Sequence, residues 1–313
     1  RRSAMAAQLA FAAVLVGLSG VAPAVSSTSR LSALLLLSHS LSGALAQTCV
    51  GNQVLSDATF STIAQCTSID GDLMVSSLTG TRSLALLQSV SGNTLVQNNN
   101  GLFSLSFDSL AFVDGHMNVT DNAALSSMAV PVLATVDGFL EFRINHAITS
   151  LSFSALSSVG RSFNVANNNA LTTCDVLVLA TTGYFFLIYT NPALTRVNIP
   201  ALTSVGGGGF FSIDNNTNLE TVSAPVLETV SGNIGIQHMP KVNSVSVPML
   251  RSTGGLILQN MQLLSNIDMP QLANVTGNVY VTNNAALASM AVPVLATVGG
   301  LIEFRINHAI TSL

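Results

Sequence analysis

One pattern recurs about every 23 residues, and this repetition constrains the fold more than any other feature of the sequence. The stretch Val275–Gly299 reads VTGNVYVTNNAALASMAVPVLATVG, and Val113–Asp137 is an almost literal copy of it. Repeats of this length are typical of solenoids, in which each unit buries its apolar face only against its neighbours. The chain of 313 residues is therefore predicted to be a repeat array rather than two ordinary domains.

Alignment on a glycine that follows a β-branched residue divides the chain into about eleven coils. Their starts lie near Gly71, Gly92, Gly115, Gly138, Arg161, Gly183, Gly207, Gly232, Gly254, Gly277 and Gly300. After the glycine, apolar residues alternate with others, as at Leu140, Phe142 and Ile144, and a period of two predicts a strand with one buried face. The glycine is expected at a corner, where a left-handed backbone is often needed.

An asparagine follows the first strand of most coils, and a proline commonly ends a second short strand. Asparagine tolerates a left-handed backbone, and stacked amides can bond one another as a ladder. The predicted ladder comprises Asn98, Asn122, Asn145, Asn168, Asn191, Asn216, Asn260, Asn284 and Asn307. Proline lacks an N–H group and therefore suits a strand end. These prolines are Pro131, Pro200, Pro225, Pro248, Pro270 and Pro293.

These features predict an all-β protein, a right-handed parallel β-solenoid of about eleven coils around an aliphatic core. A short capping helix across Asp57–Gln65 is the one helix expected in the repeat region. Because Leu313 falls midway through a coil, we expect the sequence to be a fragment. A membrane anchor, a membrane span or a further domain could then follow it.

The N-terminal part has the composition of a targeting region. We divide the chain into residues 1–46 as this region, 47–70 as an N-terminal cap and 71–313 as the repeat array. Arg30, an apolar core and Ala44-Leu45-Ala46 predict a secretory signal peptide cleaved after Ala46. Cleavage nearer Ala24 and an uncleaved membrane anchor are the alternatives. Each of them places the repeats outside the cytosol.

Three cysteines follow this region. Cys49 and Cys66 flank the segment before the first coil, and in an oxidising compartment we expect them to form a disulfide over the end of the stack. Cys174 has no evident partner in the sequence and is interpreted as a small buried residue.

The repeat text, Gly-x-Leu-x-Val/Ile-x-x-Asn followed by Leu-x-Ser-Leu-x-Val/Ile-Pro-x-Leu, resembles the receptor L-domain type of leucine-rich repeat. The opening from Cys49 through Cys66 to Leu73 is similar to that family's N-terminal cap and first coil. The nearest group is the fungal Ecm33/Sps2-like cell-surface proteins, usually glycosylated and GPI-anchored. The resemblance implies a cell-surface location and supplies no catalytic residues.

Composition excludes some functions. Charged residues make up 8% of the chain and the net charge is −4, so nucleic-acid binding is disfavoured. The five histidines have no metal-ligand spacing, and no cofactor is expected. Tyr280, or Tyr184 with Phe186, could stack on sugars, although core or scattered surface positions are the favoured interpretation.

Candidate sites are few. Three N-glycosylation sequons begin at Asn118, Asn215 and Asn274. Asp114 and Asp137 precede the glycine in successive coils, so stacking would place them about 5 Å apart, near the separation of a retaining glycosidase pair. A structural corner is the favoured interpretation of this pair, with calcium binding or catalysis as alternatives.

These observations favour a secreted or surface-anchored, non-enzymatic repeat protein with a structural, adhesion or ligand-binding role. An extracellular glycan or protein is the expected partner. The alternatives are the ectodomain of a membrane receptor and a carbohydrate-active β-helix enzyme that uses Asp114 and Asp137.

Overall fold

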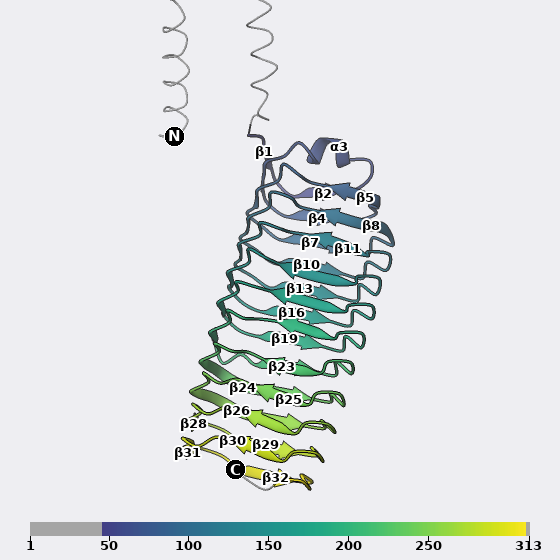
Figure 1. Cartoon of the computed structure of the whole chain (residues 1–313). Helices are drawn as coiled ribbons and strands as arrows, with labels where there is room; N and C mark the ends of the chain where they lie inside the picture. The colour runs from purple at the N-terminus through teal and green to yellow at the C-terminus, as the bar shows by residue number, and fades with distance from the viewer. Residues whose placement is uncertain (1–45, 311–313) are drawn as a thin grey trace, which may run out of the picture. The chain divides into compact units, whose positions relative to one another are not determined.

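The computed structural model describes residues 46–310, which form a single parallel β-solenoid (Figure 1). Successive turns repeat at about 23 residues, as in the bond between Asn145 and Asn168. The predicted all-β solenoid of about eleven coils is thereby confirmed. The predicted signal region, apart from Ala46, lies outside the described residues, as does the segment 311–313.

One long sheet of 22 strands runs along the solenoid. A typical turn supplies two strands to it, such as β9 (Phe112–Val113) and β10 (Met117–Thr120). They pair in parallel with β12 (Thr135–Val136) and β13 (Leu140–Arg143) of the next turn. In two turns the pair merges into one strand, β24 (Thr229–Gln237) or β26 (Ser252–Gln259). The other strands of the long sheet are β1 (Thr48–Val50), β2 (Gln53–Leu55), β3 (Ser68–Asp70), β4 (Leu73–Val75), β6 (Ser89–Val90), β7 (Thr94–Gln97), β15 (Ser158–Val159), β16 (Phe163–Ala166), β18 (Thr181–Thr182), β19 (Phe186–Tyr189), β21 (Ser204–Val205), β22 (Phe211–Asp214), β28 (Asn274–Val275), β29 (Val279–Thr282), β31 (Thr297–Val298) and β32 (Ile302–Arg305).

The remaining strand of a typical turn belongs to one of three smaller parallel sheets. The first contains β5 (Thr79–Ser83), β8 (Gly101–Ser106) and β11 (Ser127–Ala129). The second contains β14 (Ser150–Phe153), β17 (Thr173–Val176) and β20 (Arg196–Asn198). The third contains β23 (Thr221–Ser223), β25 (Ser244–Ser246), β27 (Asn266–Asp268) and β30 (Ser289–Ala291). Pro131 follows β11 by two residues, which agrees with the expected place of proline after a strand.

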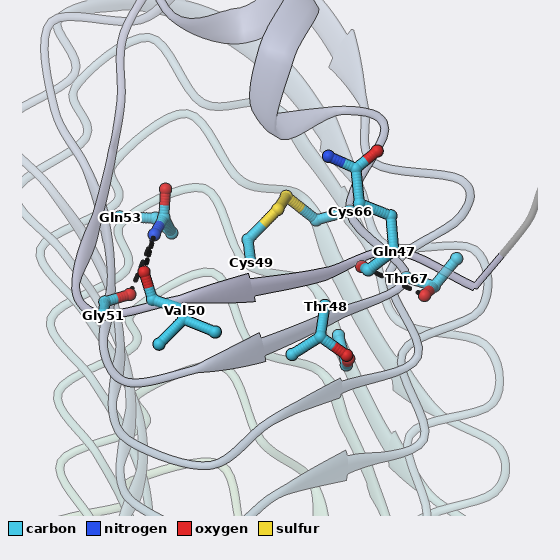
Figure 2. The surroundings of a disulfide bond; sticks show 9 residues. Gln47, Thr48, Cys49, Val50, Gly51, Gln53, Cys66 and Thr67 are labelled. Atoms are coloured by element: carbon cyan, nitrogen blue, oxygen red, sulfur yellow. Dashed lines mark hydrogen bonds between the residues drawn. A yellow bond between two sulfur atoms is a disulfide. The ribbon is translucent and has the colours of Figure 1, made fainter.

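The N-terminal cap is itself a turn of the solenoid, because β1 and β2 pair with β3 and β4. The expected helix is a single turn, α3 (Phe60–Ile63). Figure 2 shows the predicted disulfide, which joins Cys49 on β1 to Cys66 just after the helix, with Cα atoms 5.8 Å apart. The bond ties the first strand to the segment that leads into the second turn.

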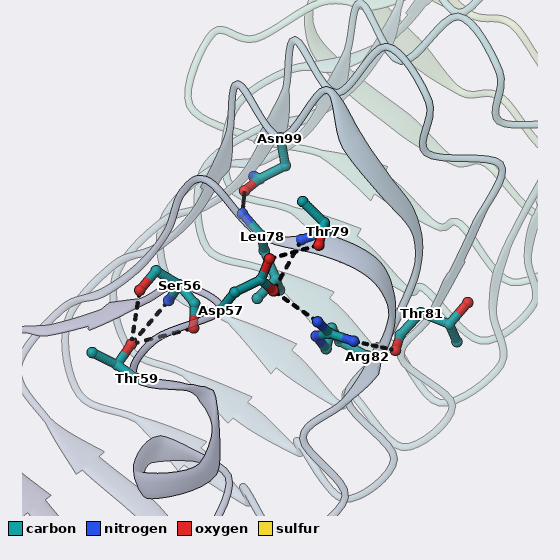
Figure 3. A network of polar contacts seen from close by, with 8 residues as sticks. All are labelled: Ser56, Asp57, Thr59, Leu78, Thr79, Thr81, Arg82 and Asn99. Carbon is teal, nitrogen blue, oxygen red and sulfur yellow. Dashed lines mark hydrogen bonds and ion pairs between the residues drawn. The ribbon is translucent and has the colours of Figure 1, made fainter.

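A polar network attaches the cap to the next turns (Figure 3). Asp57 accepts bonds from the Thr79 hydroxyl at 2.6 Å and from Arg82 Nη2 at 2.8 Å. These three groups bring together the cap loop and β5. Hydrogen bonds from Thr79 and Arg82 lower the pKa of the Asp57 carboxyl.

The core is aliphatic along its length, with a phenylalanine stack in the middle. Phe163, Phe186 and Phe211 occupy the same inward position in three successive turns. Their rings stack at 5.1 and 5.3 Å between centres. Cys174 is buried as expected, and burial raises the pKa of its thiol to about 12.

A buried asparagine ladder follows the second long-sheet strand of most turns, in a row that differs from the expected one at two places. The side chain of Asn122 shows the pattern: its oxygen accepts the N–H of Asn99 at 3.0 Å, and its amide donates to Val96 O at 2.9 Å. The row in the structure comprises Asn99, Asn122, Asn145, Asn168, Asn191, Asn216, Asn284 and Asn307. The predicted members Asn98 and Asn260 were wrong, because both lie one residue before the row, which continues at Asn99 and Met261.

The residue with a left-handed backbone conformation also lies one position before the ladder position in each repeat turn. This position has positive φ in every repeat turn, from Ser77 (56°) to Ile306 (58°). The asparagines of the ladder therefore serve to bond the neighbouring turn. Ile144, expected to point into the core, is half-buried at this position with φ 57°.

Candidate binding surface at the glycine corner

The two long-sheet strands of a turn meet at a corner where glycine is required by close approach. Successive corners bond directly, as where Gly115 N–H donates to Gly92 O at 3.0 Å. A Cβ atom on Gly254 would lie 2.6 Å from the carbonyl oxygen of Gly232. Gly254 does not have a left-handed φ, so the expected reason for the glycine was wrong here. Glycine is needed here because the neighbouring turn leaves no space for a side chain.

The residue after the corner glycine points to the next turn and bonds its backbone. Asp72 Oδ1 accepts the N–H of Asn93 at 2.7 Å, and Asn93 Oδ1 accepts the N–H of His116 at 2.8 Å. His116 Nδ1 then accepts the N–H of Phe139 at 2.9 Å. Since a backbone N–H can only donate, the ring proton of neutral His116 lies on Nε2. Sequence reasoning missed this row because its members share a position and not a residue type.

Asp114 and Asp137 lie just before the corner glycines of adjacent turns, as the alignment predicts. The register pairs Val113 with Val136, so the two carboxyl-bearing residues are neighbours at the strand spacing of about 4.8 Å. Both side chains are exposed. Asp121, the nearest other acid named by the sequence, occupies the left-handed corner after β10, at the far end of that strand.

Aromatic side chains gather at the glycine corner in four of five successive turns, and Arg161 occupies this corner in the remaining turn. We call this set the corner ridge; it consists of His116, Phe139, Arg161, Tyr184, Phe185 and Phe210. The His116 and Phe139 rings lie 4.6 Å apart, and Arg161 Cζ lies 5.6 Å from the Phe139 ring centre. Further along, the Phe185 ring lies 4.2 Å from Tyr184 and 5.5 Å from Phe210.

The corner ridge is both exposed and supported. Phe139, Tyr184 and Phe210 are 36%, 41% and 43% exposed. A Cβ atom on Gly207 would meet the Tyr184 ring at 2.7 Å, and one on Gly232 would meet the Phe210 ring at 2.7 Å. Glycine in the next turn thus makes room for the Tyr184 and Phe210 rings. Phe186, named with Tyr184 among the aromatics that could stack on sugars, lies in the core, which agrees with the favoured interpretation.

Phe112 on β9 is also exposed, and it lies beside a shallow hollow of about 550 Å³ outside the corner ridge. Phe112 and Val132 supply its apolar wall and Asp108 its charge. Ser106 and Ser83 donate hydroxyl hydrogen bonds to Asp108. These bonds, that of Ser106 above all, lower the pKa of the Asp108 carboxyl.

The sequons differ in their surroundings. Asn118 lies mid-strand on the outer face of β10, half-buried, whereas Asn215 and Asn274 are exposed. Asn215 occupies a left-handed corner, and Asn274 Oδ1 accepts the Thr297 hydroxyl at 2.6 Å. Tyr280 is half-buried, and its hydroxyl accepts the Asn278 amide at 2.9 Å.

Within residues 46–310, no group of three or more His, Cys, Asp or Glu side chains could hold a metal ion. In the same part of the chain, none of the helical structure is long and apolar enough to cross a membrane. Comparison with models of known protein families, with curated protein sequences and with solved structures found no match.

Proposed function

We propose that the chain is a secreted or surface-anchored repeat protein that binds a ligand and catalyses no reaction. The observation that carries this proposal is the corner ridge. Its rings contact one another at the surface, and Phe139, Tyr184 and Phe210 are exposed. A cluster of exposed aromatic side chains that contact one another is typical of a binding site.

The cap disulfide supports the proposed location. Disulfides persist in oxidising compartments and are rare in the cytosol, where thiols are kept reduced. The Cys49–Cys66 bond ties the first turn, which has no preceding turn to cover it among the described residues. The receptor L-domain resemblance of the repeat text agrees with an extracellular address, and a GPI-anchored wall protein and a receptor ectodomain both fit it.

The experiment expresses the full chain with an internal tag in a eukaryotic host with a secretory pathway. We expect the tag in the medium or on the cell surface, with Cys49 and Cys66 resistant to alkylation until reduction. A cytosolic product with both thiols free would refute the proposed location. Treatment with a glycosidase then shows which of the three sequons carry glycans.

The adjacent carboxylates Asp114 and Asp137 favour one second candidate, a glycan-cleaving enzyme. A retaining mechanism needs one carboxyl as acid and the other as nucleophile, about 5 Å apart. The measurement is release of reducing ends from polysaccharides by the full chain and by the Asp114→Asn/Asp137→Asn variant. Activity that disappears in the variant would replace the binding proposal by the enzymatic one.

A further inference from the structure

The hollow beside Phe112 contains one aromatic ring and one carboxylate, and it shares no residue with the corner ridge. It lies at the loop that joins β8 of the first small sheet to β9 of the long sheet. Asp108 is its charged residue, and we call it the Asp108 hollow. Apart from Asp108, Phe112 and Val132, it is lined by the uncharged residues Gln88, Ser89, Ser109 and Ala111.

Both Phe112 and Asp108 depart from the pattern of the repeat. The position of Phe112 is taken by a short polar residue in the other turns, where the registers place Ser68, Ser89, Thr135, Ser158, Thr181, Ser204, Thr229, Ser252, Asn274 and Thr297. Asp108 lies two residues after the register pair of β8, where the neighbouring turns have Ala85 and Pro131. Stacking of the turns therefore requires neither the ring nor the carboxylate, and both are available to a ligand.

The Asp108 carboxylate is oriented and has no cationic partner. The Ser83 hydroxyl donates to Oδ2 at 2.8 Å, and the Ser106 hydroxyl donates to Oδ1. Each carboxylate oxygen keeps a further acceptor position. Asp108 is exposed, and it takes part in none of the ion pairs among residues 46–310. The hollow thus presents a fixed negative charge together with a ring that is 50% exposed.

The N-terminal cap shows what such a pair of groups can hold. There the guanidinium of Arg82 binds the Asp57 carboxylate at 2.8 Å (Figure 3), and it lies 5.3 Å from the centre of the Phe60 ring. Asp57 and Phe60 are three residues apart in one segment, and Asp108 and Phe112 are four residues apart in another. The Asp108 hollow therefore offers the same two groups, and its lining contains no arginine.

A guanidinium fits this pair of groups better than the other common cation, the lysine ammonium. It is planar, so it stacks on the face of a ring while its N–H groups point at a carboxylate. It is also more weakly hydrated than an ammonium and loses less on leaving water. Asp114, which is exposed and two residues beyond Phe112, adds negative charge that attracts a cation.

We propose that the Asp108 hollow binds an arginine side chain of a partner protein, with the guanidinium stacked on Phe112 and its N–H groups directed at the Asp108 carboxylate. This second binding site goes beyond the proposed function, and neither proposal depends on the other. A cation–π contact and an ion pair at a protein surface are each weak, so a single arginine should bind with modest affinity.

The test measures binding of the secreted full chain to the peptide acetyl-Gly-Arg-Gly-amide, by ligand-detected NMR titration at low ionic strength. The same peptide with citrulline, which has an uncharged group of similar shape, should bind at least about tenfold more weakly. Asp108→Asn and Phe112→Ser should each weaken binding of the arginine peptide about fivefold, and Phe112→Tyr should retain it. Binding should fall as salt is added, because exposed charges are screened.

Two variants are matched controls. Asp121→Asn removes the same charge from an exposed position after β10, and Phe103→Ser removes a 57% exposed ring from β8. Both should leave binding of the arginine peptide unchanged. Unfolding transitions establish that all variants are folded, and serine at position 112 matches the residue type of the neighbouring turns.

Three results would overturn the inference. The first is a wild-type chain that binds the arginine peptide no better than the citrulline peptide. The second is equal weakening by Asp121→Asn and Asp108→Asn. The third is choline that binds more tightly than the arginine peptide and depends on Phe112, which would assign the hollow to a small quaternary amine. Secretion and the thiol measurement are scored on the same samples, so a secreted, oxidised protein that binds no arginine leaves the proposed location standing.

Discussion

The side-chain oxygen of Asn168 accepts the backbone N–H of Asn145 in the preceding turn, at 3.0 Å. The same side chain donates its amide to Phe142 O at 3.1 Å. One buried residue thus satisfies two backbone groups of a turn more than 20 residues away in sequence. This relationship, repeated along most of the solenoid, holds successive turns together where the aliphatic core ends.

Replacement of Asn168 by Ala should leave the Asn145 N–H and the Phe142 carbonyl buried without these partners. Each unsatisfied buried group costs about 1–3 kcal/mol, so we expect a loss of roughly 2–4 kcal/mol in the free energy of unfolding. Chemical denaturation measures this value. Asn169→Ala is the matched control, because Asn169 is exposed and adjacent, and it should change stability little. Equal effects of the two variants would contradict the role assigned to the ladder.

Ile144→Asn should stabilise the protein. Ile144 is a β-branched residue with φ 57°, a conformation that such side chains rarely adopt and that Asn tolerates. We expect a gain of about 1 kcal/mol, seen as a higher denaturation midpoint. The reverse change, Asn167→Ile, tests the same position in the next turn and should destabilise the protein by a similar amount. A loss of stability in Ile144→Asn would show that packing of the isoleucine outweighs its backbone strain.

Gly254→Ala should destabilise the solenoid through contact with the neighbouring turn. The added Cβ would lie 2.6 Å from Gly232 O, and the Gly232 backbone is itself held by its N–H bond to Gly209 O at 3.0 Å. Overpacking of this kind costs about 1–3 kcal/mol. Gly208→Ala is the comparison, because its Cβ has nothing within 4 Å but its φ is +75°. We expect the smaller loss there, about 1 kcal/mol, from backbone strain alone.

Acidification should remove the contribution of the Asp108 carboxylate to the free energy of unfolding. Its pKa is lowered in the folded state by hydrogen bonds from Ser106 and Ser83, so the carboxylate stabilises the fold above its unfolded pKa of about 3.9. That stability is lost as pH falls through the lower folded pKa. Ser83→Ala should therefore cost less than about 1 kcal/mol at neutral pH, given solvent screening, and a smaller amount near pH 2, where more of the carboxyl is protonated. Denaturation at both pH values checks this, with Ser104→Ala on the neighbouring strand β8 as control.

Thiol labelling should distinguish the three cysteines. Burial raises the pKa of Cys174 to about 12, so the folded protein should react with no alkylating reagent at neutral pH. Denaturation without reductant should expose one thiol, and denaturation with reductant three, because Cys49 and Cys66 are joined. Mass spectrometry counts the adducts. Labelling of Cys174 in the native protein would indicate that the middle turns open readily.

Local patterns were sufficient to predict the solenoid, its turns and the cap disulfide. The period of about 23 residues and the alternation after each glycine place apolar side chains on one face, and only stacking of neighbouring turns can bury that face. The same alignment placed Asp114 beside Asp137, since equivalent positions in adjacent turns must be neighbours.

Other features depend on contacts between turns. The ladder runs through Asn99 and not Asn98 because the left-handed residue comes first, and composition alone cannot distinguish two adjacent asparagines. The corner glycines are needed because the backbone of the neighbouring turn occupies the space of a side chain. The corner ridge has no motif in the sequence. Its rings come together because parallel stacking in register converts a separation of 23 residues into that of adjacent strands, about 4.8 Å.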